Sequence, residues 1–168
     1  MSELEVWLRG RAIDGVPALL QPVAHSLLQC GEEIQRSLSG MSPEQIWRSE
    51  NGAASIGFHV LHAIGSLDRL FTYARGALLS DAQRQALVQE SHPNSDVSAD
   101  DLRTAFDRAV ERALEQLRTT DPATLTDARG VGRSKLPSTV VGLLFHAAEH
   151  TQRHAGQIVT TKKVTGVA

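Results

Sequence analysis

Cysteine is almost absent from this sequence of 168 residues, which contains a single one, Cys30. One cysteine excludes a disulfide within the chain and is compatible with a reducing, cytoplasmic environment. No basic residue adjoins Cys30 to stabilise a thiolate. We therefore interpret Cys30 as a small buried residue in preference to a reactive nucleophile.

Aromatic residues and net charge are also scarce. Only 4% of the residues are aromatic and the formal net charge is −2, so the chain offers neither stacking platforms nor a basic surface for nucleic acid. No apolar run approaches the roughly 18 residues of a membrane span. The N-terminus, MSELEVWLRGR, carries acidic residues and arginine where a signal peptide needs an apolar segment. We expect a cytoplasmic protein that binds neither nucleic acid nor membrane.

Apolar residues recur at intervals of three and four along most of the chain, which is the spacing of amphipathic helices. We expect long helices at residues 17–38, 54–79, 99–118 and 138–161, and a short helical turn at 81–90. Residues 119–137 are predicted to form a long polar loop, and about the first 15 residues an extended lead-in. No β-type alternation is found. The sequence therefore predicts one all-α domain over residues 1–168, built as a helical bundle.

Histidines are arranged with a regular spacing in the last predicted helix, where His146, His150 and His154 recur every four residues. On an ideal helix the three lie within about 80° of one another and border its apolar side. Histidines four residues apart are about 6 Å from each other, close enough to bind one metal ion together. His146 and His154, about 12 Å apart along the axis, cannot easily share an ion. One adjacent pair can therefore bind, and a further ligand has to come from another helix.

The predicted helix 54–79 can supply that ligand, because it carries His59 and His62 beside a stripe of hydroxyl groups and an arginine. Such a stripe is equally consistent with a solvated helix face. The spacing alone does not decide which of these histidines binds an ion.

The two histidine segments together, SIGFHVLHAIGSLDR and AAEHTQRHAGQI, resemble the DinB-like superfamily. The segments VWLRGRAIDGVPALLQPVAHSLLQCGEEI and SGMSPEQIW resemble it as well, so the similarity covers most of the chain. The resemblance implies a four-helix bundle in up-down-down-up order with long crossover connections, often assembled as a homodimer. It also implies one divalent ion held by three histidines, which by motif are His62, His150 and His154.

The implied site would have an open coordination position, because three neutral imidazoles do not complete the shell of a divalent ion. Zinc or nickel suits nitrogen ligands best and iron or copper are alternatives, whereas calcium and magnesium prefer oxygen. Such an ion lowers the pKa of bound water towards about 7 and deprotonates a bound thiol.

The resemblance implies a link to low-molecular-weight thiols, because characterised members of this superfamily include transferases and isomerases that use bacillithiol or mycothiol. Thiol S-transfer to a small electrophile is therefore the leading hypothesis for the reaction. Metal-dependent hydrolysis is the second hypothesis, and a non-catalytic module for metal binding or dimerisation is the third.

Further residues are candidates for the surroundings of the ion. Ser66, Arg69 and Tyr73 follow His62 along one stripe and are predicted to contact the substrate, although a surface ion pair is the alternative for Arg69. Gln157 follows His154 within the Gly156-Gln157 pair of the family's motif and is predicted to orient a ligand or a water molecule. His146 and His59 lie outside the motif. They are candidates for the same supporting role, with a hydrogen-bonded core histidine as the alternative.

Overall fold

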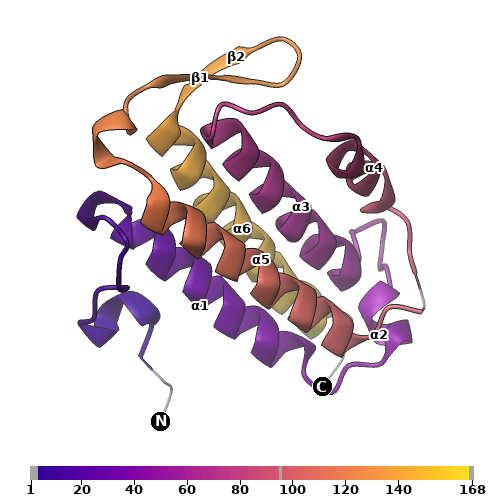
Figure 1. The fold of residues 1–168 in the computed structure, drawn as a ribbon. Helices are drawn as coiled ribbons and strands as arrows, with labels where there is room; N and C mark the ends of the chain where they lie inside the picture. Colours follow the sequence, from indigo (N-terminus) through magenta and orange to yellow (C-terminus); the bar gives the residue numbers. More distant parts are fainter. Residues whose placement is uncertain (1–3, 95, 167–168) are drawn as a thin grey trace.

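Four long helices form the body of the protein, whose computed structural model describes residues 4–94 and 96–166 (Figure 1). They are α1 (Gln21–Leu38), α3 (Ile56–Ala74), α5 (Ala99–Thr119) and α6 (Val140–Val164). α1 and α6 run in one direction, and α3 and α5 in the other. Each helix packs against two neighbours, because α1 and α3 both contact α5 and α6. The prediction of an all-α bundle in up-down-down-up order is confirmed.

The apolar faces of these helices meet in one core. Its fully buried side chains come from all four helices and include Leu27, Ile34, Leu67, Phe106, Leu117, Leu144 and Ile158. Burial of one such side chain contributes roughly 1.5–3 kcal/mol. Cys30 is also fully buried, and its thiol donates to Oε1 of Gln152 over 3.0 Å. Burial, with a smaller contribution from Glu33, raises the pKa of Cys30 to about 12, as expected of a structural cysteine.

Side chains at the helix ends determine where the helices begin and stop. Ser98 and Asp101 form a capping box at the start of α5, with the shorter acid at its fourth position. α6 begins at Val140 and not at residue 138, because the hydroxyl of Thr139 accepts from the backbone N–H of Gly142. α3 ends at Ala74 and not at residue 79, because Gly76 adopts a φ of 75°, which stops a helix.

The connections between the helices differ in length and path. α2 (Pro43–Trp47) lies between α1 and α3, which join at one end of the bundle (Figure 1). The connection between α3 and α5 instead crosses from one end of the bundle to the other and contains α4 (Asp81–Gln89), which packs against α3. This long crossover allows α3 and α5 to run parallel.

The loop predicted for residues 119–137 is wrong in part, because this segment contains regular structure. Pro122–Thr124 forms a 3-10 turn, η3, and β1 (Ala128–Val131) pairs with β2 (Leu136–Thr139) as an antiparallel hairpin. Gly132 and Lys135 in its turn have positive φ angles of 69° and 47°. Strands of four residues are too short to show a clear alternation of polar and apolar residues, which explains why the pattern was missed.

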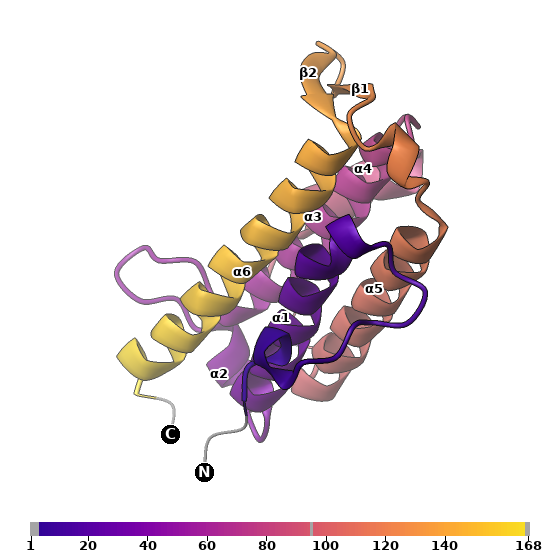
Figure 2. The ribbon, with the colours of Figure 1, turned by 90° about the vertical axis from the view of Figure 1, so that its left-hand side faces the viewer.

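The N-terminal segment lies across α1 (Figure 2). Within the first 15 residues, which were predicted to be an extended lead-in, Val6–Arg9 forms a 3-10 helix, η1. The helix predicted from residue 17 begins as an α-helix only at Gln21, and Ala18–Leu20 forms another 3-10 helix, η2, directly before it. Arg9 donates to both carboxylate oxygens of Glu32 on α1, over 2.6 and 2.7 Å, and this pair fastens the segment to the bundle. Among the described residues, no helix combines the length and the apolar character needed to cross a membrane.

Candidate metal centre

Three histidines converge where α3 and α6 pack against each other in opposite directions. Nε2 of His62 lies 3.1 Å from Nε2 of His150, and the ring centroid of His154 lies 4.8 Å from that of His62 and 4.6 Å from that of His150. One ring nitrogen of each residue falls within 4.8 Å of the others. Nitrogens bound to one tetrahedral zinc ion stand about 3.4 Å apart. Small side-chain rotations would therefore let these three half-buried imidazoles bind one ion.

The orientation of His62 is fixed by a carboxylate. Nδ1 of His62 lies 2.8 Å from Oε2 of Glu90, the residue that follows α4. A carboxylate can only accept a hydrogen bond, so in the neutral ring Nδ1 carries the hydrogen and Nε2 keeps its lone pair. That lone pair is on the nitrogen that faces His150, which is the arrangement that a metal ligand needs.

Glu90 is itself buried and held in place. Glu90 is only 5% exposed, and its Oε1 accepts a hydrogen bond from Nη1 of Arg69 over 2.5 Å. Burial alone would raise the pKa of Glu90, but the hydrogen bonds from His62 and Arg69 and the charge of Arg69 outweigh it and hold this pKa below its usual value. Gly65 leaves the space for this pair, because a Cβ atom there would stand 2.0 Å from Oε1 of Glu90.

His154 is paired with a second histidine. Its Nδ1 lies 3.0 Å from Nδ1 of His59, a residue of α3 that is 7% exposed. One of the two nitrogens has to donate and the other has to accept, so this hydrogen bond cannot form if both Nδ1 atoms are protonated. If Nε2 of His154 binds an ion, its Nδ1–H donates to His59, and His59 then orients this ligand.

His150 has a weaker and more exposed support. Nη2 of Arg153 lies 3.1 Å from Nδ1 of His150, but Arg153 is 60% exposed and also pairs with Glu149. An ion on Nε2 of His150 would place the hydrogen on Nδ1, which could then no longer accept from Arg153. Arg153 would keep its pair with Glu149.

Burial and neighbouring charges favour the neutral form of His59, His150 and His154. Burial, followed by the neighbouring His150 and His62, lowers the pKa of His154 to about 4. Burial and the neighbouring His62 also lower the pKa of both His150 and His59. Imidazole binds a metal only when it is neutral. The geometry of the three converging rings, with the neutral form favoured at His150 and His154, therefore fits a divalent transition metal.

The other predicted residues lie at different distances from this cluster. The side chain of Arg69 is only 11% exposed and forms a buried ion pair with Glu90. Its contact with a substrate stays a prediction. Ser66 is buried one turn after His62, and Tyr73 packs against the core further along α3. Gln157 is exposed on α6. His146 is 49% exposed and bonds to Glu149 over 2.6 Å, so it is not the core histidine considered as an alternative.

Sequence reasoning missed two residues next to His62. Phe58 stacks on the His62 ring with centroids 5.4 Å apart and an angle of 10° between the planes. Its spacing of four residues from His62 is a signal that could have revealed it. Glu90 is 28 residues away from His62 in the sequence and lies outside any helical pattern that relates the two. Only the folding of α4 against α3 brings it to the site.

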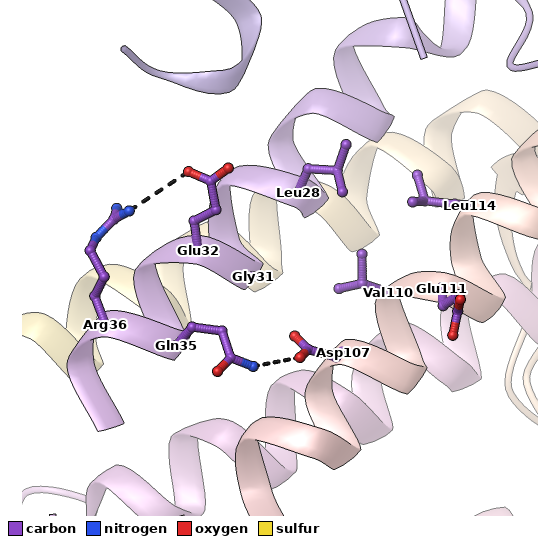
Figure 3. A pocket seen from close by; sticks show the side chains of 9 residues that line it. All are labelled: Leu28, Gly31, Glu32, Gln35, Arg36, Asp107, Val110, Glu111 and Leu114. Atoms are coloured by element: carbon purple, nitrogen blue, oxygen red, sulfur yellow. Dashed lines mark hydrogen bonds and ion pairs between the residues drawn. The ribbon is translucent and has the colours of Figure 1, made fainter. Parts of the chain in front are cut away.

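A groove of about 620 Å³ lies elsewhere on the bundle, between α1 and α5 (Figure 3). Leu28, Val110 and Leu114 form its apolar part, and Glu32 with Arg36 and Gln35 with Asp107 pair along its edges. None of the nine residues that line it is a histidine. The groove is therefore separate from the candidate metal centre.

Comparison with known proteins identifies the same fold. A family model described as the DinB superfamily matches residues 26–158. A conserved protein from Enterococcus faecalis is similar in structure with a TM-score of 0.71 and 16% identity, over 86% of this chain and 95% of that one. A DinB-like protein from Bacillus cereus ATCC 10987 gives a TM-score of 0.64 and 15% identity, over 84% of this chain and 92% of that one. No curated protein gives a significant match.

Proposed function

Since this chain belongs to the DinB superfamily, we propose that it binds one divalent transition-metal ion through His62, His150 and His154 and uses it in thiol S-transfer to a small electrophile. The observation that carries the metal-binding part is the convergence of the three imidazoles within 4.8 Å. The hydrogen bond from Nδ1 of His62 to Glu90 adds to it, because it leaves Nε2 of His62 free to bind. Zinc or nickel is the proposed metal, with iron or copper as alternatives.

The proposed reaction needs a thiol whose pKa is lowered and metal ligands that are held in place. The ion, when bound, supplies the charge that lowers the pKa of a thiol at the open coordination position. In the transfer the thiol loses its proton, sulfur forms a bond to the electrophilic carbon, and the leaving group departs with the electron pair of the bond that breaks. The protein holds the His62 and His154 rings through Glu90 and His59, and Phe58 covers one face of His62.

Two other functions use the same histidines. Metal-dependent hydrolysis would place water at the open position in place of a thiol. A non-catalytic module would bind the ion without turnover or use it in the assembly of a homodimer. The family resemblance supports a homodimer, and size-exclusion chromatography at several protein concentrations tests for it. Substrate contacts by Arg69, Ser66 and Tyr73 belong to the catalytic alternatives, and so does the role of Gln157 and His146 near the ion.

The function is tested with purified protein, first by elemental analysis and then with a panel of thiols. Cysteine, glutathione, bacillithiol and mycothiol are each offered with a few small electrophiles to zinc-loaded and metal-stripped protein. We expect about one metal ion per chain and conjugation only with metal present. Equal rates in both preparations, or no conjugation with any thiol, would remove S-transfer and leave hydrolysis or metal binding without turnover.

A further inference from the structure

The α4 segment, residues 77–94, is attached to the bundle by polar contacts more than by apolar burial. None of the nine described residues of α4 is buried, and Val88 is 61% exposed. Nε2 of Gln83 donates to Oδ2 of Asp68 and to Oγ1 of Thr72 on α3, over 2.7 and 2.8 Å. Elements with few buried apolar contacts open at low free energy. α4 is therefore an element whose docking depends on a few hydrogen bonds.

Glu90 is the deepest of these attachments. It is 5% exposed although it directly follows a helix without buried residues, and it reaches both Arg69 and His62 on α3. α3 has a glycine at position 65, where any larger side chain would collide with the carboxylate. The surface of α3 thus has space for a carboxylate from the α4 segment beside Nδ1 of His62.

We propose that Glu90 couples docking of the α4 segment to occupancy of the metal centre. When Nε2 of His62 binds an ion, its Nδ1–H becomes a stronger donor to Glu90, which holds the segment down. Docked Glu90, kept in place by Arg69, in turn fixes the His62 tautomer that binds the ion. Coupling of two binding events is reciprocal, so the ion and the docked segment stabilise each other by the same factor. This inference rests on the metal binding proposed above.

The expected factor follows from the role of Glu90 beside a ligand. Loss of a hydrogen-bonding partner of a metal ligand weakens metal binding by about 10- to 100-fold. Glu90→Gln keeps the size of the side chain and an oxygen acceptor but removes the charge that pairs with Arg69. We therefore expect zinc binding by Glu90→Gln to be weaker by about tenfold, the lower end of that range.

The test measures metal affinity and the α4 segment separately, and neither measurement uses activity. Zinc affinity is obtained by competition with a chelator, and the docking of α4 by hydrogen exchange of the amides of residues 81–90 with and without zinc. In the wild-type protein we expect zinc to slow this exchange by about tenfold or more. In Glu90→Gln the slowing should shrink by about the same tenfold factor as the affinity.

Glu32→Gln is the matched control. It makes the same chemical change in another carboxylate that pairs with an arginine, at a site on α1 away from the histidines. It should leave zinc affinity and the exchange of residues 81–90 as in the wild type.

Three results separate the possible failures. Zinc affinity in Glu90→Gln within twofold of the wild type overturns the coupling. Exchange of residues 81–90 that does not change when wild-type protein takes up zinc overturns it as well, and this measurement needs no variant, so it holds even if Glu90→Gln does not fold. Wild-type protein that takes up neither zinc nor nickel, iron or copper refutes the proposed metal binding itself.

Discussion

Gly65→Ala is expected to destabilise the protein, although alanine is the better helix former. In an exposed helix interior, alanine is favoured over glycine by about 1 kcal/mol. At position 65 the added Cβ would stand 2.0 Å from Oε1 of Glu90 and 2.6 Å from Nη1 of Arg69, so this pair has to move. The two side chains are only 6% and 11% exposed and have little room to shift, and breaking a buried pair outright costs about 3–5 kcal/mol. The free energy of unfolding should therefore fall by up to about 4 kcal/mol, which is the cost of breaking the pair less the helix preference of alanine.

Urea unfolding of metal-free protein, followed by circular dichroism, measures this change, and Gly31→Ala on α1 is its control. A Cβ at Gly31 would meet no atom within 4 Å, so this substitution should be neutral or stabilise the protein by up to about 1 kcal/mol. If Gly65→Ala is as stable as Gly31→Ala, the carboxylate of Glu90 does not occupy the space beside Gly65, and the reasoning about this pair is wrong.

Three further outcomes are expected. Replacing His62, His150 or His154 by alanine should sharply reduce the zinc content found by elemental analysis, whereas His25→Ala should not; full zinc content in His150→Ala would contradict the assignment. Because the pKa of His154 is lowered to about 4, this residue stays neutral in the metal-free fold while the unfolded chain, with a pKa near 6.5, takes up a proton. The contribution of His154 to the free energy of unfolding should thus be complete above about pH 6.5 and be lost as the pH falls towards about 4. Urea titrations at several pH values would detect this loss. Cys30, with its pKa raised to about 12, should resist iodoacetamide at pH 8 in the native protein and react once it is unfolded; rapid native labelling would show an accessible thiolate.

The fold was predictable from the sequence because its information is local. Apolar spacing marked each long helix, and signals such as Ser98 and Asp101 at the start of α5 marked helix ends. Positions where a single residue overrides the pattern were missed, as at Gly76, which ends α3 early. The β1–β2 hairpin was missed because it is held by pairing between strands too short to carry a pattern.

The candidate site was predictable only where its members lie on regular helices. His150 and His154 share a helix face, and the family motif adds His62. His59 is three residues before His62, and helical spacing does not decide which of the two belongs to the metal site. In the structure both face α6, His62 towards His150 and His59 towards His154. Glu90 could not be predicted, because its position depends on how α4 docks, which is a tertiary contact without a sequence period.

The order of the helices along the chain determines when this site can exist. His62 and His150 are separated by 88 residues, and α6, which carries two of the three histidines, packs against both α1 and α3. Chains emerge from the ribosome N-terminus first, so α1, α3 and α5 are synthesised while the partner of the His62 face is still missing. A single imidazole on α3 binds a divalent ion too weakly to organise the chain around it, and closing so long a loop costs entropy that only the packing of α6 repays. Ion uptake at the proposed site would therefore follow completion of the bundle, and zinc supplied during synthesis should not speed folding.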